Sequence, residues 1–159
     1  FGESEYLSSL ATHAEPYDYI IVDIPMASLD AMRECLRIAH LAVVVLPCDG
    51  IALRSAHGFL SLLREERAKP NRRFDTRIAA NRFGIEVPGQ AKLEETIETY
   101  LAPVLFEARI PFCTAIRESM ARGHNPMAAA PEAMGPKAIR GMAQEIGAMS
   151  DKLTESGLA

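Results

Sequence analysis

The sequence predicts an α/β fold in which helices cover both faces of a parallel β-sheet. Short apolar segments rich in valine and isoleucine alternate with longer segments whose apolar residues recur at helical spacing. No Asn-Gly or Asp-Gly turn joins two strand-like segments, so crossover helices are expected to connect the strands. With 159 residues, 48% of them hydrophobic, the chain is expected to form a single domain, 1–159.

The first part of the chain predicts a helix, a strand and a second helix. Residues 5–14 have apolar side chains at helical spacing, and Pro16 ends that pattern. Residues 19–24 are almost wholly apolar and β-branched, which is typical of a strand covered on both faces. We therefore expect a central parallel strand there. Residues 28–39 return to helical spacing, and Ser28 is a suitable N-cap.

The middle of the chain continues the alternation. Residues 41–47, LAVVVLP, form the most strand-like segment of the sequence. A helix is predicted over 51–68, ending in a charged turn before Pro70. The next strand is expected over 77–83, RIAANRF, and an amphipathic helix over 90–101.

The last part predicts a strand over 104–111, VLFEARIP, and a short helix from about residue 114 to 122. A loop rich in glycine, proline and alanine leads to Gly135 and a final helix. Its apolar residues are spaced by three and four: Ile139, Met142, Ile146, Met149 and Leu153. Because the opposite face mixes acidic and basic residues, this helix is expected to pack on the sheet and not on a membrane.

Composition narrows the function classes. The net charge of −4 and the pI near 5.6 restrict any nucleic-acid contact to a local surface. Cys35, Cys48 and Cys113 are far apart and form no CxxC pair, so neither a disulfide framework nor a zinc site is indicated. No basic-then-apolar leader opens the chain and no apolar run reaches the roughly 20 residues of a membrane span. The protein is expected to be soluble and cytoplasmic.

Polar residues at the ends of predicted strands indicate a functional site. Ligands of open α/β sheets bind outside the carboxyl ends of the strands, and Asp23 ends the strand predicted over 19–24. A magnesium ion or its water shell would keep such a carboxylate charged. The alternative is that Asp23 caps the following helix.

Two further strand ends support a ligand site. Asn81 ends its strand with an amide that can donate to and accept from a purine edge, and Ile110 and Pro111 end the next strand. The alternative is structural: Asn81 opens a turn and Pro111 stops a strand.

Four stretches in this order resemble the carboxyl-terminal half of the ParA/MinD family of deviant P-loop ATPases. They are YDYIIVDIP at 17–25, AHLAVVVLPCDGIALRSAHGFLSLL at 39–63, NRFG at 81–84 and IPFCTAIRESMARGHNPM at 110–127. The resemblance covers nearly the whole chain. It implies the three-layer αβα fold of P-loop NTPases, which is Rossmann-like.

The resemblance also implies an activity and its residues. Asp23 would be the catalytic residue and would hold Mg²⁺ through water, and residues 24–27 would belong to a switch. ATP would be bordered by the following cofactor-binding residues: Pro25, Asn81, Arg82, Ile110 and Pro111. The implied protein is an ATP-dependent homodimer with slow ATP hydrolysis and an activating partner protein. Such proteins position plasmids, chromosomes or cellular complexes on DNA, a membrane or a cell pole.

Two departures from the family pattern bear on the activity. The family's Asp-Thr-Pro-Pro is replaced by Asp-Ile-Pro-Met at 23–26, which removes a hydroxyl. No glycine-rich loop followed by Lys and Ser/Thr occurs in the 159 residues, so this chain alone is not expected to hydrolyse ATP. Either a preceding half holds that loop, and the sheet of this chain is incomplete, or the loop has been lost. In the second case the chain is a non-catalytic scaffold or localisation module, for example one of a pilus-assembly type.

Two basic surfaces are candidates for nucleic-acid contact. The densest basic stretch is REERAKPNRR at 64–73, in which Arg72 and Arg73 are the candidate phosphate contacts. Arg117 and Arg122, on the helix after Pro111, form the second candidate surface. The alternative for both surfaces is ordinary solvation of charged helix ends. DNA is the expected nucleic acid, and a membrane is the less favoured surface.

Overall fold

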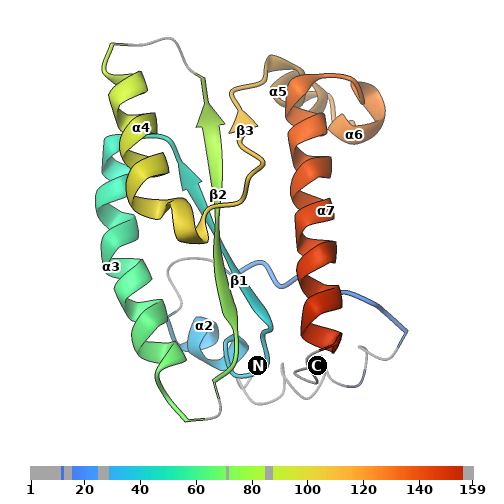
Figure 1. The fold of residues 1–159 in the computed structure, drawn as a ribbon. Coiled ribbons are helices and arrows are strands. Elements are labelled where there is room, and N and C mark those ends of the chain that lie inside the picture. Colours follow the sequence, from blue (N-terminus) through green and yellow to red (C-terminus); the bar gives the residue numbers. More distant parts are fainter. Residues whose placement is uncertain (1–11, 13–15, 25–28, 71, 85–87, 156–159) are drawn as a thin grey trace.

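A computed structural model describes residues 12, 16–24, 29–70, 72–84 and 88–155, with side chains as far as Asp151. Among these residues it contains three strands, β1 to β3, with α-helices and one 3-10 helix, η1 (Figure 1). In chain order the elements are α2 Leu29–Cys35, β1 Leu41–Pro47, α3 Gly50–Arg67, β2 Asp75–Phe83, α4 Gln90–Leu101, η1 Ala102–Val104, β3 Ile110–Pro111, α5 Thr114–Ala121, α6 Pro126–Ala129 and α7 Met134–Glu155.

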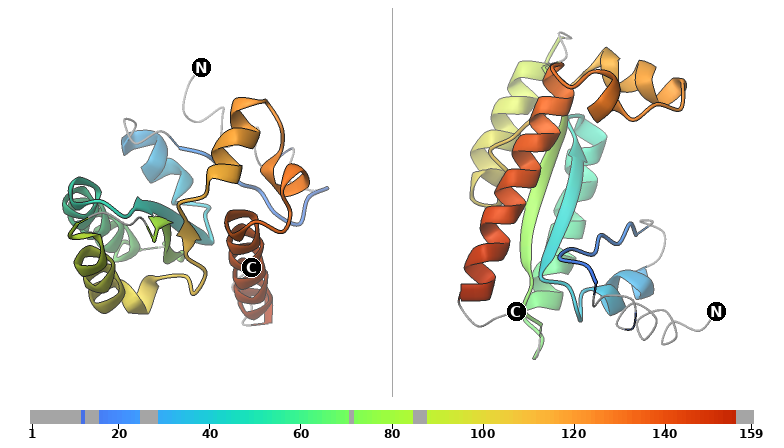
Figure 2. Two further views of the ribbon diagram at one scale, coloured as in Figure 1. Left: turned by 90° about the horizontal axis from the view of Figure 1, so that it is seen from above. Right: turned by 90° about the vertical axis from the view of Figure 1, so that its right-hand side faces the viewer.

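The strands form one parallel sheet in the order β1-β2-β3. β1 pairs with β2 over its whole length, from Leu41 opposite Asp75 to Pro47 opposite Asn81. Helices α3 and α4 cover one face of the sheet and α7 covers the other (Figures 1 and 2). The predicted α/β class, with helices on both faces of a parallel sheet, is confirmed.

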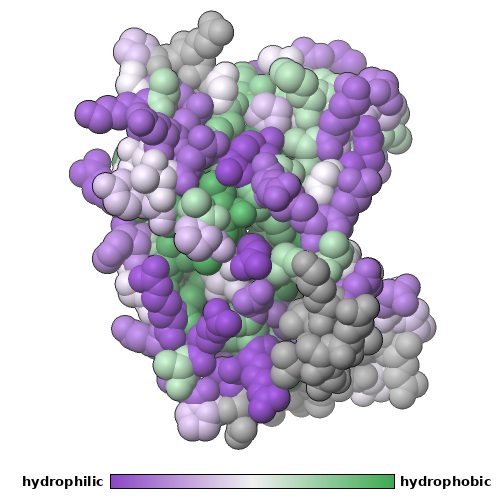
Figure 3. All heavy atoms as spheres, in the orientation of Figure 1, coloured by the Kyte–Doolittle hydropathy of each residue, from purple (hydrophilic) through white to green (hydrophobic). Residues whose placement is uncertain are grey.

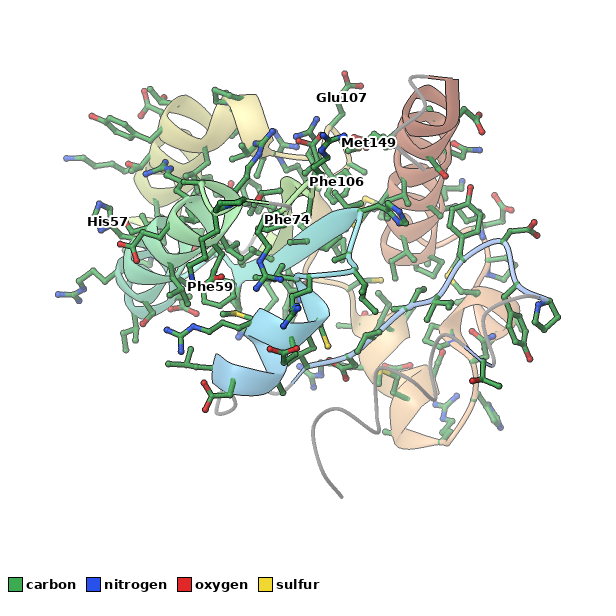
Figure 4. All side chains as sticks on the ribbon, turned by 90° about the horizontal axis from the view of Figure 1, so that it is seen from below. His57, Phe59, Phe74, Phe106, Glu107 and Met149 are labelled. Atoms are coloured by element: carbon green, nitrogen blue, oxygen red, sulfur yellow. The ribbon has the colours of Figure 1, made fainter. Side chains whose placement is uncertain are left out.

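Each face of the sheet has its own apolar core. The α3-side core includes buried side chains from α2, β1, α3, β2 and α4: Met32, Leu46, Leu60, Leu63, Ile78 and Ile97. The α7-side core contains Ala79, Phe106 and Met142, with Ile146 and Met149 packed against them. Seen from below, Phe74 lies toward α3 and Phe106 toward α7 (Figure 4). The prediction that the final helix packs on the sheet is therefore confirmed.

A carboxylate of α7 also holds the chain that leads into β3. Glu145 accepts hydrogen bonds from the backbone N–H groups of Glu107 and Ala108, at 2.8 and 2.7 Å. Charge-assisted hydrogen bonds of this kind are stronger than neutral ones, so Glu145 connects α7 to the sheet by more than apolar contact.

Apolar atoms are visible between α4 and α7 on the face toward the viewer, bordered by hydrophilic side chains (Figure 3).

The structure corrects the prediction of a central strand at 19–24. Residues 17–24, here called segment 17–24, pair with no strand among the described residues, and Ile21 is 93% exposed. The segment crosses behind the sheet instead of running along β1 (Figures 1 and 2). A β-branched sequence becomes a buried strand only where a neighbouring edge and apolar layers on both faces receive it. Here most side chains of segment 17–24 are exposed.

Most of the remaining elements follow the predictions, but the helix expected over 28–39 ends at Cys35, and α6 forms in the stretch before Gly135 that was predicted to be a loop. The strand expected over 104–111 is reduced to the two residues of β3, because Val104 ends η1 and Leu105 makes only an isolated bridge to Ile78. Of the helix predicted over 5–14, only Thr12 is described, and it is helical. None of the helices in the described part of the chain is both long and apolar enough to cross a membrane.

Candidate functional site

The carboxyl ends of the three strands form one continuous edge, here called the rim: residues 47–49, 81–84 and 110–113. The strand register places Pro47 opposite Asn81, and Asn81 opposite Ile110. Past the strand ends, the Cys48 N–H donates to the Asn81 carbonyl at 2.8 Å. The Phe112 N–H similarly donates to the Phe83 carbonyl at 2.9 Å. These ladders bring Asn81, Ile110 and Pro111 together, as the sequence predicted.

The backbone of β2 is distorted at the rim. Arg82 has φ of 62°, and it is the one non-glycine residue with positive φ in the described ranges. The register with β3 shifts between Asn81 and Phe83, which is a bulge. The Asn81 side-chain oxygen accepts from the Arg82 N–H at 2.9 Å and holds this turn. A left-handed conformation for a residue with a long side chain costs of order 1–3 kcal/mol and is concentrated at functional sites.

A buried polar network fixes the base of the rim. Gln90 is buried, and its amide donates to the Cys48 carbonyl at 3.0 Å and to the Glu94 carboxylate at 3.2 Å. The same Glu94 oxygen accepts from the Gly84 N–H at 2.7 Å. The sequence did not predict this network, because Gln90 and Glu94 fit the polar face of an amphipathic helix. Their spacing of four residues at the start of that helix was the one sequence feature that indicated a hydrogen bond between them.

The two cysteines near the rim differ in their ionisation. Burial, and then the Glu94 charge, raise the pKa of Cys48 to about 11, so Cys48 is a neutral thiol at pH 7. Burial also acts to raise the pKa of Cys113, but N–H groups of Ile116, Gly135 and Ala115 bring the net pKa below the ordinary value.

The rim continues from β3 into α5 through a closely packed junction. Phe112 is 37% exposed, and the Arg117 guanidinium lies over its ring at 5.7 Å from the centroid. Gly135, at the start of α7, is buried, and a Cβ there would lie 2.9 Å from the Cys113 Cβ. Only glycine therefore lets α7 begin this close to the end of β3.

Asp49 is another polar residue of the rim. It caps α3 by accepting from the N–H groups of Ile51 and Ala52, at 3.0 and 2.7 Å. A Ser, Thr, Asp or Asn immediately before a helical pattern is the usual sequence signal for such a cap. The Asp49 carboxylate therefore already occupies the amino terminus of α3.

Asp23 is placed apart from the rim. It is exposed, and the segment to which it belongs crosses behind the sheet below the carboxyl ends of the strands (Figure 1). Pro25, the other candidate from this motif, lies outside the described residues. No group of three or more His, Cys, Asp or Glu side chains suited to a metal ion occurs in the part of the chain that the structure describes.

The candidate nucleic-acid residues lie at opposite ends of the sheet. Arg72 and Arg73 precede the amino end of β2, whereas Arg117 and Arg122 belong to α5 and its end, beyond the carboxyl end of β3. Arg122 lies 3.9 Å from the Glu118 carboxylate. The four arginines therefore do not form one surface.

Arg72 and Arg73 themselves differ in environment. Arg72 is only 13% exposed in its side chain and faces Glu66 at 3.9 Å, while Arg73 is exposed and makes no ion pair with a described residue. Glu66 is the buried carboxylate of this end, with 1% of its side chain exposed. It also accepts from Lys69 at 2.7 Å and from Arg33 at 3.3 Å. Arg73 is thus the more accessible of the two side chains.

Comparison with known proteins did not identify a family for this chain. The chain matched neither a protein-family model nor a curated protein.

Proposed function

We propose that this chain is the carboxyl-terminal part of an ATP-dependent, dimerising switch ATPase of the ParA/MinD type. It would act in the partitioning or positioning of DNA, a plasmid or a cellular complex. The observation that carries the proposal is the rim, where the strand register places Asn81 beside Ile110 and the left-handed Arg82. A rim of this kind is where open α/β sheets bind nucleotides.

The rim offers groups suited to an adenine base. The Asn81 amide nitrogen makes no hydrogen bond to a described residue, so it can donate to a purine ring nitrogen while the carbonyl oxygen holds Arg82. Ile110 and Pro111 are half-buried and supply an apolar border. Base recognition would thus come from β2 and β3, whose relative positions are set by their ladder.

Hydrolysis would require groups that lie elsewhere. Bound Mg²⁺ would neutralise phosphate charge while water attacks the γ-phosphate and releases ADP. Asp23 is the carboxylate of this chain proposed to hold that ion through water, and segment 17–24 would have to move toward the rim to do so. The phosphate-binding loop, absent from these 159 residues, would come from another segment of the protein. The proposed partners are a second copy, an activating protein and non-specific DNA.

A non-catalytic scaffold is the second candidate function. The position of segment 17–24 below the rim favours it, because Asp23 is then free of any nucleotide role (Figure 1). In that case the fold would serve partner binding or localisation.

Calorimetric titration with MgATP, on this chain and on the full gene product that contains it, separates the two functions. Asn81→Ala in the gene product is expected to weaken MgATP binding about tenfold, because one hydrogen bond of roughly 1–1.5 kcal/mol is lost. Gln144→Ala, which removes an exposed amide from α7, is the matched control and should leave the affinity unchanged. Absence of binding by both proteins would reject the ATPase and favour the scaffold.

A further inference from the structure

Cationic side chains outnumber carboxylates in the ion pairs at the amino end of the sheet. The cations are Arg33, Arg67, Lys69, Arg72 and Arg77. They share three carboxylates: Asp30, Glu66 and Asp75. The exposed Arg73 adds a further positive charge that pairs with no described residue. This end is therefore positive although the whole chain has a net charge of −4, and it is suited to an anionic ligand.

Glu66 is the buried centre of these ion pairs, and its two oxygens differ. Oε1 accepts hydrogen bonds from Lys69 at 2.7 Å and from Arg33 at 3.3 Å. Oε2 is buried and accepts no hydrogen bond from the described residues, and the Arg72 guanidinium lies 3.9 Å from it. A buried acceptor without a donor has lost its hydration without compensation. Arg72 is thus attracted to Glu66 without being hydrogen-bonded to it.

Arg72 can leave Glu66 without isolating the buried charge. After its departure Oε1 keeps both hydrogen bonds, so the carboxylate retains two cationic partners. A phosphate group would offer the Arg72 guanidinium two oxygens in the bidentate geometry that the 3.9 Å contact lacks. The side chains of Arg33 and Lys69 are 41% and 52% exposed, so they also have N–H groups left to donate to a ligand.

We propose that the cations around Glu66, together with Arg73, bind the phosphates of duplex DNA, and that the Glu66 carboxylate competes with those phosphates for Arg72. Duplex DNA carries one charge per about 1.7 Å of its axis, which suits cations contributed by both α2 and the loop before β2. A single small anion would engage only part of this set. The inference rests on the DNA-binding part of the proposed function and not on nucleotide binding. It gives Glu66 a role in setting the affinity for DNA.

Removal of the Glu66 charge tests the competition. The probe is a labelled duplex of random sequence, and its binding to the full gene product with MgATP is measured by fluorescence anisotropy over a range of salt concentrations. Glu66→Gln should raise the affinity at least about threefold at low salt and steepen its salt dependence, because Arg72 then reaches a phosphate. Glu65→Gln removes the same charge from the exposed neighbouring position and should raise the affinity less. This control separates the release of Arg72 from the change in net charge.

Two further measurements follow Arg72 itself. In the Glu66→Gln protein, Arg72→Gln should remove the whole gain in affinity, whereas in the unaltered protein, where Glu66 holds Arg72, it should cost less. The side-chain N–H resonance of Arg72 provides a readout that needs no substitution. It should shift when duplex is added to the unaltered protein, whereas the resonance of Arg54, at the rim end of α3, should not.

Several outcomes would overturn this DNA site. One is a folded Glu66→Gln protein that binds duplex no more tightly than Glu65→Gln does. Another is an Arg72 resonance that does not move with duplex bound, whatever Glu66→Gln does to folding. Displacement of the duplex by inorganic phosphate at constant ionic strength would assign the cations to one small anion.

The same proteins separate this site from the nucleotide proposal. MgATP binding without duplex binding by any of them would reject the DNA site and leave the ATPase standing. The coupled effects of Glu66→Gln and Arg72→Gln in a gene product that binds no MgATP would support the DNA site and reject the ATPase.

Discussion

At the scale of single residues, the rim and the ion cluster around Glu66 depend on side chains with specific partners. Asn81 holds the left-handed Arg82, and Gln90 ties α4 to the end of β1. The buried Glu66 carboxylate is surrounded by three cationic side chains: Arg33 of α2, Lys69, and Arg72 in the loop before β2. Arg72 therefore mainly pairs with the buried Glu66 carboxylate and contributes little exposed charge.

Glu66 should make stability depend on acid pH. Its hydrogen bond from Lys69 is the largest cause, and Arg33 adds to it, so the folded-state pKa lies below 4.5. The stabilisation is therefore fully present above pH 4.5 and is lost as the pH falls through the lowered value. We expect Glu66→Gln to reduce the free energy of unfolding by about 1–2 kcal/mol at pH 7, because Arg33 and Lys69 remain half-exposed and can be solvated.

Urea denaturation at pH 7 and at successively lower pH measures this difference. The difference between Glu66→Gln and the unaltered chain should shrink below pH 4.5. Glu65→Gln, at the exposed neighbouring position, is the control and should have little effect at either pH. A pH-independent difference would mean that the Glu66 charge is not what stabilises this end.

At the scale of elements, α7 positions β3. β3 has only two residues, and the chain before it makes one isolated bridge to β2. Its position therefore depends on Phe106 in the α7-side core and on the Glu145 hydrogen bonds to Glu107 and Ala108. A strand this short does not position itself, because two residues supply too few ladder bonds.

Glu145→Gln should loosen this connection. The amide of glutamine keeps one acceptor oxygen but places an NH₂ group against a backbone N–H, so we expect a loss of about 1–2 kcal/mol in the free energy of unfolding. Amide exchange at Glu107 and Ala108 should become faster, whereas Glu95→Gln on the exposed face of α4 should change neither quantity. Unchanged exchange at both amides would contradict this role.

At the scale of the whole molecule, the two ends of the sheet differ in chemistry. The carboxyl end holds the rim, and the amino end gathers the basic stretch and the Glu66 cluster. A nucleotide at the rim and a phosphate backbone at the amino end would then occupy opposite ends of β2. Any coupling between them would pass through the sheet or through α3.

Charge reversal separates the two candidate DNA surfaces. In the full gene product with MgATP, Arg73→Glu is expected to weaken non-specific duplex DNA binding about tenfold at low salt and to reduce its salt dependence. Arg122→Glu, which changes an exposed arginine at the other end of the sheet, is the matched comparison. A larger loss with Arg122→Glu in a filter-binding or anisotropy assay would assign the DNA surface to α5.

The agreement with the sequence-based predictions is best for helices. The helix predicted over 90–101 has the bounds of α4, α5 begins at Thr114 as expected, and the apolar stripe of α7 packs on the sheet. Helical hydrogen bonds join residues close in sequence, so the spacing of apolar residues and the residues at helix ends contain most of the information that specifies a helix. The alignment of Asn81 with Ile110 was also predictable, because parallel strand ends meet at one edge.

The α/β class, the helices α3, α4, α5 and α7 and the order of the rim residues were thus predictable from the residues alone. Three features could not be predicted in this way: segment 17–24 is not a strand, β3 is short, and Arg72 faces a buried Glu66. The physical reason is that strands and ion clusters are completed by partners distant in sequence. Residues 17–24 have the composition of a strand, but composition cannot specify whether an edge is available to receive them.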